Sequence, residues 1–145
     1  MAVHCLSEPA VEITLETSRL ELWLLSIEDM QSIVDDPHSV EVWQNKPYRN
    51  PHGIFVGDPG PIRWRLPQAV RDPSTHQWFI RLMVEKSSRV IVGSLSFHEP
   101  PDKNGMLEVG LGVAPAEQRN GYATEALIGL WSWATQFPEV QTFRY

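Results

Sequence analysis

The amino-acid sequence predicts an α/β domain in which helices flank a mainly antiparallel central sheet, and three observations support this class. The chain has 145 residues, the size of one ordinary domain, so we interpret residues 1–145 as a single domain. The segments 78–84, 91–97 and 107–113 each alternate in the manner of β-strands. From residue 123 the apolar residues instead recur with the period of a helix.

The first elements of the chain are predicted to be two short strand segments and a helix. Apolar residues alternate over 11–15, and their phase shifts in the next run, 20–24, which indicates a bulge or a break between two strand segments. Ser26 stands three residues before Asp29, the spacing of a capped helix start. Apolar residues then follow at helical spacing, and Pro37 ends the predicted helix.

A proline-rich stretch over 37–73 follows this helix. It holds seven of the twelve prolines and three of the nine glycines, so long regular elements are not expected there. Its many apolar and aromatic residues are unlike those of a solvated linker. We therefore expect an ordered excursion packed on the domain, with helical turns near 40–44 and 64–71. Long ordered loops often line binding sites.

The second half of the chain is predicted to contain a meander followed by a helix. Polar turns over 86–89 and 100–105 join the three alternating segments, which indicates consecutive antiparallel strands. Pro115 ends the third strand, and an amphipathic helix is expected over 123–137. Residues 140–145 have the pattern of a further strand.

Composition argues against several functional classes. The formal net charge is −6 at pH 7, which is unlike a nucleic-acid-binding surface and mildly favours a cationic or amine-bearing partner. Cys5 is the single cysteine, so a disulfide framework is excluded. No apolar run is long enough to span a membrane and no secretory signal is recognisable, so we expect a cytoplasmic protein. The five histidines are scattered, and no metal is expected.

The segment 118–123 is the one that points to a specific chemistry, because it joins a strand to the start of the amphipathic helix. The first N–H groups of a helix have no partners within it and attract anions such as a diphosphate. Gly121 lets a ligand approach the backbone, and Arg119 adds a positive charge. A dinucleotide fingerprint is rejected, because Pro115 stands where its third glycine should be. Taken alone, the segment can equally be an ordinary helix start.

The same segment resembles the acetyl-CoA signature of the GNAT acetyltransferases, Gln/Arg-x-x-Gly-x-Gly/Ala. It stands here as Gln118-x-x-Gly121-x-Ala123, after a strand and a proline as in that family. The opening run over 15–20 and the helix start over 26–29 are similar to the branch that acetylates ribosomal proteins and small molecules. The resemblance runs from about residue 13 to residue 145 and is weakest across the proline-rich stretch.

The resemblance implies acetyl-CoA as the co-substrate, with no metal. Its diphosphate is expected on the signature turn, which comprises Gln118, Arg119, Asn120, Gly121, Tyr122, Ala123 and Thr124. Its pantetheine arm is expected along the backbone of Leu111, Gly112 and Val113. The alternation of this strand adds an independent observation: Glu108, Gly110 and Gly112 share one face, and the two glycines leave a slot without side chains.

The implied reaction is direct attack of a primary amine on the thioester in a ternary complex. An ammonium group cannot attack, so a base that removes its proton is useful at neutral pH. We predict that Glu108, at the end of the glycine slot, is this base. The alternative is that Glu108 simply faces solvent on a half-exposed sheet. Backbone N–H groups of the same strand are candidates for stabilising the oxyanion.

The acceptor implied by the resemblance is an amine-bearing small molecule or a protein or peptide amine, with no nucleic acid or membrane involved. The family's acceptor pocket uses the early loop and the strand edges, so four residues are candidate substrate-binding residues: Trp43, Tyr48, His52 and His98. The alternative for the aromatic residues is packing over the irregular loop.

The resemblance also predicts a departure at the end of the chain. The family continues with another strand, a helix and a final hairpin, so these C-terminal strands and the helix are expected to be missing, with the tyrosine that often protonates the leaving thiolate. A strand over 140–145 would then lack a partner, so we expect either a fragment of a longer polypeptide or a homodimer that completes the sheet. Two other functions stay open: a catalytically inactive CoA-binding or structural module, and an unrelated interaction domain.

Overall fold

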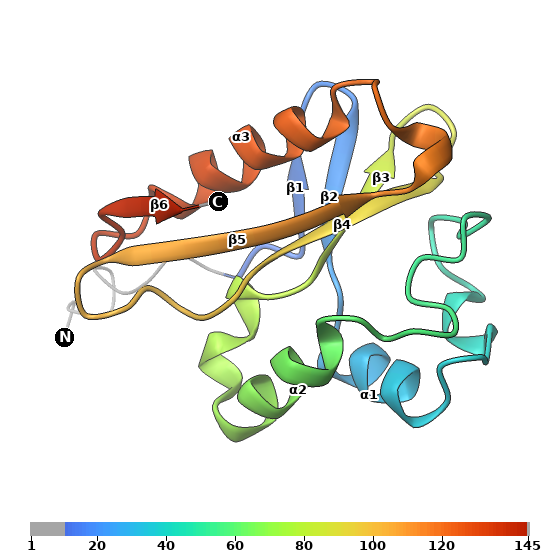
Figure 1. Ribbon diagram of the computed structural model, residues 1–145, viewed down its shortest axis with the longest axis horizontal. Helices are drawn as coiled ribbons and strands as arrows, with labels where there is room; N and C mark the ends of the chain where they lie inside the picture. The colour runs from blue at the N-terminus through green and yellow to red at the C-terminus, as the bar shows by residue number, and fades with distance from the viewer. Residues whose placement is uncertain (1–10, 145) are drawn as a thin grey trace, which may run out of the picture.

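The computed structural model describes residues 11–144, so Cys5 and Tyr145 lie outside its described part. The centre is a six-stranded sheet whose strands follow one another in chain order (Figure 1). These strands are β1 Thr14–Glu16, β2 Leu20–Leu24, β3 Arg81–Glu85, β4 Ile91–Phe97, β5 Met106–Val113 and β6 Thr142–Arg144. Neighbouring strands are antiparallel except β5 and β6, which are parallel. The predicted α/β class with a mainly antiparallel sheet is confirmed.

The phase shift in the first apolar run is a turn between two separate strands. Leu15 of β1 lies opposite Leu22 of β2, and the Thr17 N–H closes the turn by donating to the Leu20 carbonyl at 2.8 Å. The predicted strand start at Val11 is wrong, because β1 begins at Thr14 and Val11 is 54% exposed. Residues without a partner strand or a buried face gain nothing from extended pairing.

Helices α1 (Ile27–Asp35) and α2 (Ile62–Arg71) lie on one side of the sheet, and α3 (Tyr122–Ala134) lies on the other (Figure 1). The Ser26 side chain accepts a hydrogen bond from the Asp29 N–H at 3.0 Å, which confirms the predicted cap. Because both faces are covered, β3 and β4 are largely buried on both sides. Among the described residues, no helix has the length and apolar character that crossing a bilayer requires.

The proline-rich stretch contains the two predicted helical pieces, a short 3₁₀ helix at Glu41–Trp43 and helix α2. A second 3₁₀ helix, Pro73–Trp78, corrects the predicted start of the next strand. Trp78 belongs to that helix and packs against Trp133 of α3 with ring centroids 5.1 Å apart. Trp78 therefore continues the apolar alternation from a helical turn, and strand β3 begins only at Arg81.

Strands β3, β4 and β5 form the predicted meander, and β6 extends the sheet beyond it. Three residue pairs join β6 to β5, from Met106 opposite Thr142 to Glu108 opposite Arg144. The expectation that the last strand lacks a partner is therefore wrong, because β5 supplies one. This pairing covers only the first part of β5, and the rest of that edge becomes important for the site.

Candidate functional site

The predicted glycine slot lies on the face of the sheet that α2 covers. The register of β4 and β5 places Ser94 opposite Gly112 and Ser96 opposite Gly110. Residues directly opposite one another in an antiparallel pair project from the same face. The two glycines therefore leave a strip of bare backbone beside two small serine side chains.

The outer edge of β5 is open where these glycines lie. β6 pairs with β5 only as far as Glu108, and no other strand of the described residues follows that edge. Main-chain groups of alternate residues point to opposite edges of a strand. The Glu108 carbonyl and the Ala114 N–H both bond toward β4, so the N–H groups of Leu111 and Val113 point to the open edge. An extended ligand can pair there as an added strand.

The turn before α3 presents a row of unpaired N–H groups. From Arg119 to Thr124 no main-chain N–H has an acceptor within the described residues, and the first helical bond runs from the Glu125 N–H to the Gly121 carbonyl at 3.1 Å. Arg119 and Gly121 have φ angles of 69° and 81°. Alternation of left- and right-handed backbone makes successive N–H groups converge on an anion. A cavity of about 340 Å³ joins this turn to residues 111–113.

Two side chains of the signature hold the turn in place. The Gln118 Nε2 amide donates to the Val113 carbonyl at 3.0 Å, and the Asn120 Nδ2 amide donates to the Glu117 carbonyl at 3.0 Å. The first bond ties the turn to the end of β5, so the row of N–H groups and the open strand edge form one surface. This explains why a glutamine suits the first position of the motif.

A polar cluster ties the start of α3 to the β1–β2 turn. The Glu125 carboxylate accepts hydrogen bonds from the Thr17 hydroxyl and from the Arg19 N–H and Nε. Burial alone would raise the pKa of Glu125, but these bonds hold it below the ordinary value. The Tyr122 hydroxyl bonds to Glu85, and the Arg19 guanidinium lies 4.6 Å from the Tyr122 ring centroid. The Tyr122 side chain therefore packs inside the fold, and only its backbone faces the turn.

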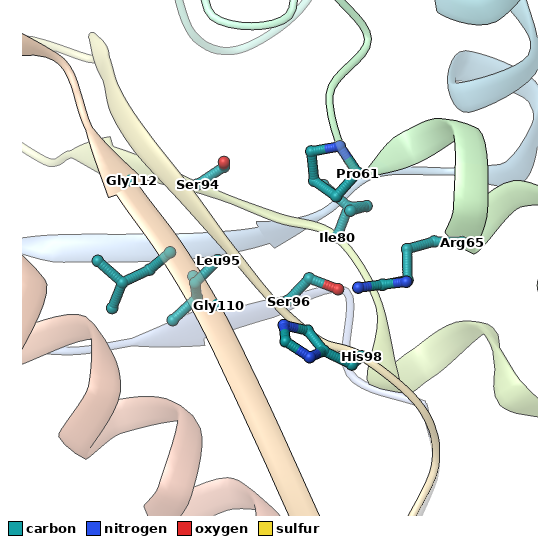
Figure 2. A pocket seen from close by; sticks show the side chains of 10 residues that line it. Pro61, Arg65, Ile80, Ser94, Leu95, Ser96, His98, Gly110 and Gly112 are labelled. Carbon is teal, nitrogen blue, oxygen red and sulfur yellow. The ribbon is translucent and has the colours of Figure 1, made fainter. Parts of the chain in front are cut away.

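A second cavity, of about 290 Å³, lies between the glycine slot and α2 (Figure 2). Its lining includes Arg65 of α2, Ser96 of β4 and His98 just after β4. It shares Leu111 and Gly112 with the cavity at the signature turn. A ligand on the turn and a ligand under α2 would therefore meet at the glycine slot.

The predicted base, Glu108, stands beyond the slot on the same strand face. Its carboxylate is 38% exposed, accepts a hydrogen bond from Arg144 at 3.2 Å and lies 3.5 Å from Nδ1 of His98. The Arg144 hydrogen bond, with the charges of both neighbours, lowers the pKa of Glu108. The carboxylate is therefore ionised at neutral pH. Its exposure is also what the solvent-facing alternative requires, so the geometry fits both interpretations.

The four candidate acceptor residues lie in different environments. His98 lines the second cavity. Tyr48 is buried against Trp23, with ring centroids 5.5 Å apart, and burial raises the pKa of its hydroxyl to about 12. Trp43 packs against the core cluster, and neither aromatic residue lines this cavity. His52 pairs with Glu117 at 2.8 Å, beside the signature turn. The structure thus brings only His98 to the slot and gives the two aromatic residues the packing role.

Sequence reasoning missed Arg65, Ser94 and Ser96. The serines had a signal, since they alternate with His98 on one face of a predicted strand next to the glycine strand. Arg65 had none, because the orientation of α2 depends on tertiary contacts such as the bond from Gln68 Nε2 to the His98 carbonyl at 3.4 Å. Within residues 11–144, no group of three or more histidine, cysteine or acidic side chains is placed to hold a metal ion.

The geometry described so far defines a class of protein: a mixed α/β domain with a helix-start anion turn joined to an open strand edge. Comparison with protein families identifies the class. The acetyltransferase (GNAT) domain model matches residues 19–145, and the chain belongs to this family. The resemblance drawn from the signature turn is confirmed.

Individual relatives agree with this assignment. The uncharacterized N-acetyltransferase YjdG of Bacillus subtilis is 40% identical over 53 residues, which are 37% of this chain and 32% of YjdG. A putative ribosomal-protein-serine acetyltransferase from Vibrio cholerae superposes with a TM-score of 0.51 at 17% identity, covering 88% of this chain and 70% of that one. The microcin C7 self-immunity acetyltransferase MccE, solved with acetyl-CoA and AMP, gives 0.52 at 15% identity, covering 87% and 68%. These structural likenesses establish the fold.

Proposed function

We propose that this chain transfers an acetyl group from acetyl-CoA to a primary amine. The observation that carries the proposal is the row of unpaired N–H groups from Arg119 to Thr124, which shares one cavity with residues 111–113 of the open strand edge. A diphosphate suits the first feature, and an extended arm with amide groups suits the second. Membership of the GNAT family supports acetyl transfer, and the acetyl-CoA in the MccE structure supports the choice of donor.

The acceptor reaches the thioester from the second cavity, because the two cavities meet at Leu111 and Gly112. With both substrates bound, the amine nitrogen attacks the acetyl carbon, a C–N bond forms and the C–S bond breaks. CoA leaves as a thiolate that takes up a proton. The oxyanion of the tetrahedral intermediate needs a hydrogen-bond donor, and the Leu111 N–H on the open edge is the candidate.

The attacking amine must first lose a proton. Glu108 is our candidate base, acting directly or through a water molecule, because it is ionised and lies on the same strand face as the slot. An amine-bearing small molecule and a protein or peptide amine are both compatible with this scheme. A chain that binds CoA and never turns over would instead be a CoA-binding module.

Calorimetric titration of the chain with acetyl-CoA, CoA and NADH tests the donor site. We expect heat with the first two ligands and none with NADH, and a thiol-release assay on a panel of amines then tests turnover. Gly121→Val should weaken acetyl-CoA binding by about tenfold or more, because a branched side chain obstructs the turn. Gly53→Val is the matched control: Gly53 also has a positive φ, 66°, but lies outside both cavities. Absence of acetyl-CoA binding, or equal losses in both variants, would sink the proposal.

A further inference from the structure

Arg65 is the charged group of the second cavity that the proposed reaction leaves unused. It projects from α2, and its Nε is buried without a hydrogen-bond partner in the described part of the chain. No ion pair within residues 11–144 involves its guanidinium. Burying a cation without a partner costs free energy of folding unless a bound ligand supplies the counter-charge.

The position of Arg65 directs this charge into the cavity. Figure 2 shows its side chain extending from α2 toward Ser96 and His98. The Ser96 hydroxyl donates to the neighbouring Phe97 carbonyl at 2.7 Å, so its oxygen remains an acceptor and gives no counter-charge. Burial lowers the pKa of Arg65, and the charge of Glu99 offsets this only in part, because the two side chains form no ion pair.

Arg63, two residues away on the same helix, shows what an ordinary surface arginine does here. Its guanidinium pairs with Asp58 at 3.0 Å and lies 5.4 Å from the Trp64 ring centroid. Half of its side chain is exposed, and it lines neither cavity. Arg71, at the end of α2, has no ion pair either, but it is exposed and lines neither cavity. Arg65 therefore differs from the other two arginines of α2 in being partly buried in a cavity without a partner.

We propose that Arg65 binds a carboxylate of the acceptor, so that the acceptors of this chain are amines that also carry a carboxylate. The inference rests on the proposed function, which places the reacting amine at the slot where the two cavities meet. A guanidinium binds a carboxylate through two parallel hydrogen bonds, which fixes the orientation of the acceptor as well as its affinity. Glu108, at the other side of Gly110, has the charge that attracts the ammonium end.

Acetyl-CoA is excluded as the source of this anion, because Arg65 and the signature turn line different cavities. The phosphate-binding turn has its own cation, Arg119, and Arg65 is absent from the lining of that cavity. Residues Leu111 and Gly112 stand between the two. An anion at Arg65 therefore enters with the acceptor.

The test compares acceptors with their amides: L-alanine with L-alaninamide, L-methionine with L-methioninamide, and alanyl-glutamate with alanyl-glutamine. In the dipeptide pair the charge changes on a side chain remote from the α-amine, so the reacting amine is nearly the same in both members. Binding to the CoA-saturated chain is measured by NMR titration, which does not require turnover, and acetylation rates are measured in parallel. We expect at least one acid to bind about tenfold more tightly than its amide, the effect of one charge-assisted pair. Arg65→Gln should reduce that ratio to about one and leave CoA affinity unchanged, and Arg65→Lys should keep part of it.

Arg63→Gln is the matched control, since it removes the same charge from the same helix, and it should keep the full preference for the acid. Equal binding of acid and amide in every pair would overturn the proposal, as would a preference that survives in Arg65→Gln. Loss of CoA affinity in Arg65→Gln would assign the arginine to the donor and overturn it too. The chain could also prefer acids through Arg65 without binding acetyl-CoA. In that case the proposed function would be wrong and the carboxylate site would still be supported.

Discussion

A Cβ atom on Gly110 would lie 2.9 Å from Nε2 of His98, so the imidazole occupies space that any other residue at position 110 would fill. The ring lines the second cavity because the strand beneath it has no side chain there. Gly110 thus makes room for the side chain of His98, and in the proposed reaction it belongs to the acceptor side of the site.

Gly110→Ala should therefore displace the His98 ring and reduce the efficiency of acetylation. We expect kcat/KM for the acceptor to fall by between ~10-fold and ~100-fold, the cost of misplacing a group that positions a substrate. Affinity for acetyl-CoA should change little, because the signature turn lies in the other cavity. Steady-state kinetics with titration of acetyl-CoA checks this. An unchanged kcat/KM would show that His98 does not position the acceptor.

Gly112→Ala tests the proposed binding of acetyl-CoA in the slot, where Gly110→Ala tests the position of the acceptor. A Cβ atom there meets no atom of the protein within 4 Å, so the free chain should be as stable as the wild type or more stable by about 0.5 kcal/mol. If the pantetheine arm lies across this residue, acetyl-CoA binding should weaken by about tenfold, or about 1.4 kcal/mol. Thermal melting and calorimetry of the same sample separate the two effects. Wild-type affinity would mean that the arm does not pass over Gly112.

The glycines show what the sequence could and could not predict. Alternation along β5 was enough to place Glu108, Gly110 and Gly112 on one face, because a strand has a fixed period of two. The different roles of the glycines depend on their register against the neighbouring strand, which alternation does not fix. A Cβ on Gly93 of β4 would lie 2.3 Å from the Gly112 carbonyl oxygen, so that glycine serves close packing of the strands.

The residues proposed to bind the acceptor were harder to predict than those proposed to bind acetyl-CoA, because they also depend on contacts between distant segments of the chain. The signature turn is local: residues 118–124 form it with help from one bond to Val113. Arg65 and His98 are 33 positions apart in the numbering and meet through the packing of α2 on the sheet, which no local pattern specifies. Tyr48 shows the same dependence, because its position in the loop fits both a pocket and a packing role, and only the folded structure shows its ring packed on Trp23.

Arg81 is predicted to be a main stabilising residue outside the site. It is completely buried, donates to the carbonyls of Glu12, Ile13 and Leu22, and lies 5.1 Å from the Trp133 ring centroid. Arg81→Leu should lower the free energy of unfolding by about 2 to 4 kcal/mol, because three main-chain carbonyls, the buried one of Leu22 among them, lose a charged donor. Arg71→Leu, at an exposed position, should stay within about 0.5 kcal/mol. Urea unfolding compares them, and equal midpoints would contradict the assignment.

The last prediction concerns the protonation of Glu108. The Arg144 hydrogen bond holds its pKa below the ordinary value of 4.5, so the carboxylate is a proton acceptor throughout the neutral range. This ion pair stabilises the fold above pH 4.5, and its contribution is lost as the pH falls through the lowered pKa.

Glu108→Gln should reduce kcat by about 100-fold at pH 7, the low end for removal of a general base. The loss should shrink toward pH 9 to 10, where more of the acceptor amine is already neutral. Arg144→Gln is the control: the pKa of Glu108 rises toward 4.5, but the carboxylate stays ionised at pH 7, so that variant should keep its rate. A pH–rate profile of the three proteins measures both effects. Wild-type turnover by Glu108→Gln at pH 7 would assign the carboxylate to the solvent-facing surface of β5 and leave the amine to be deprotonated by water.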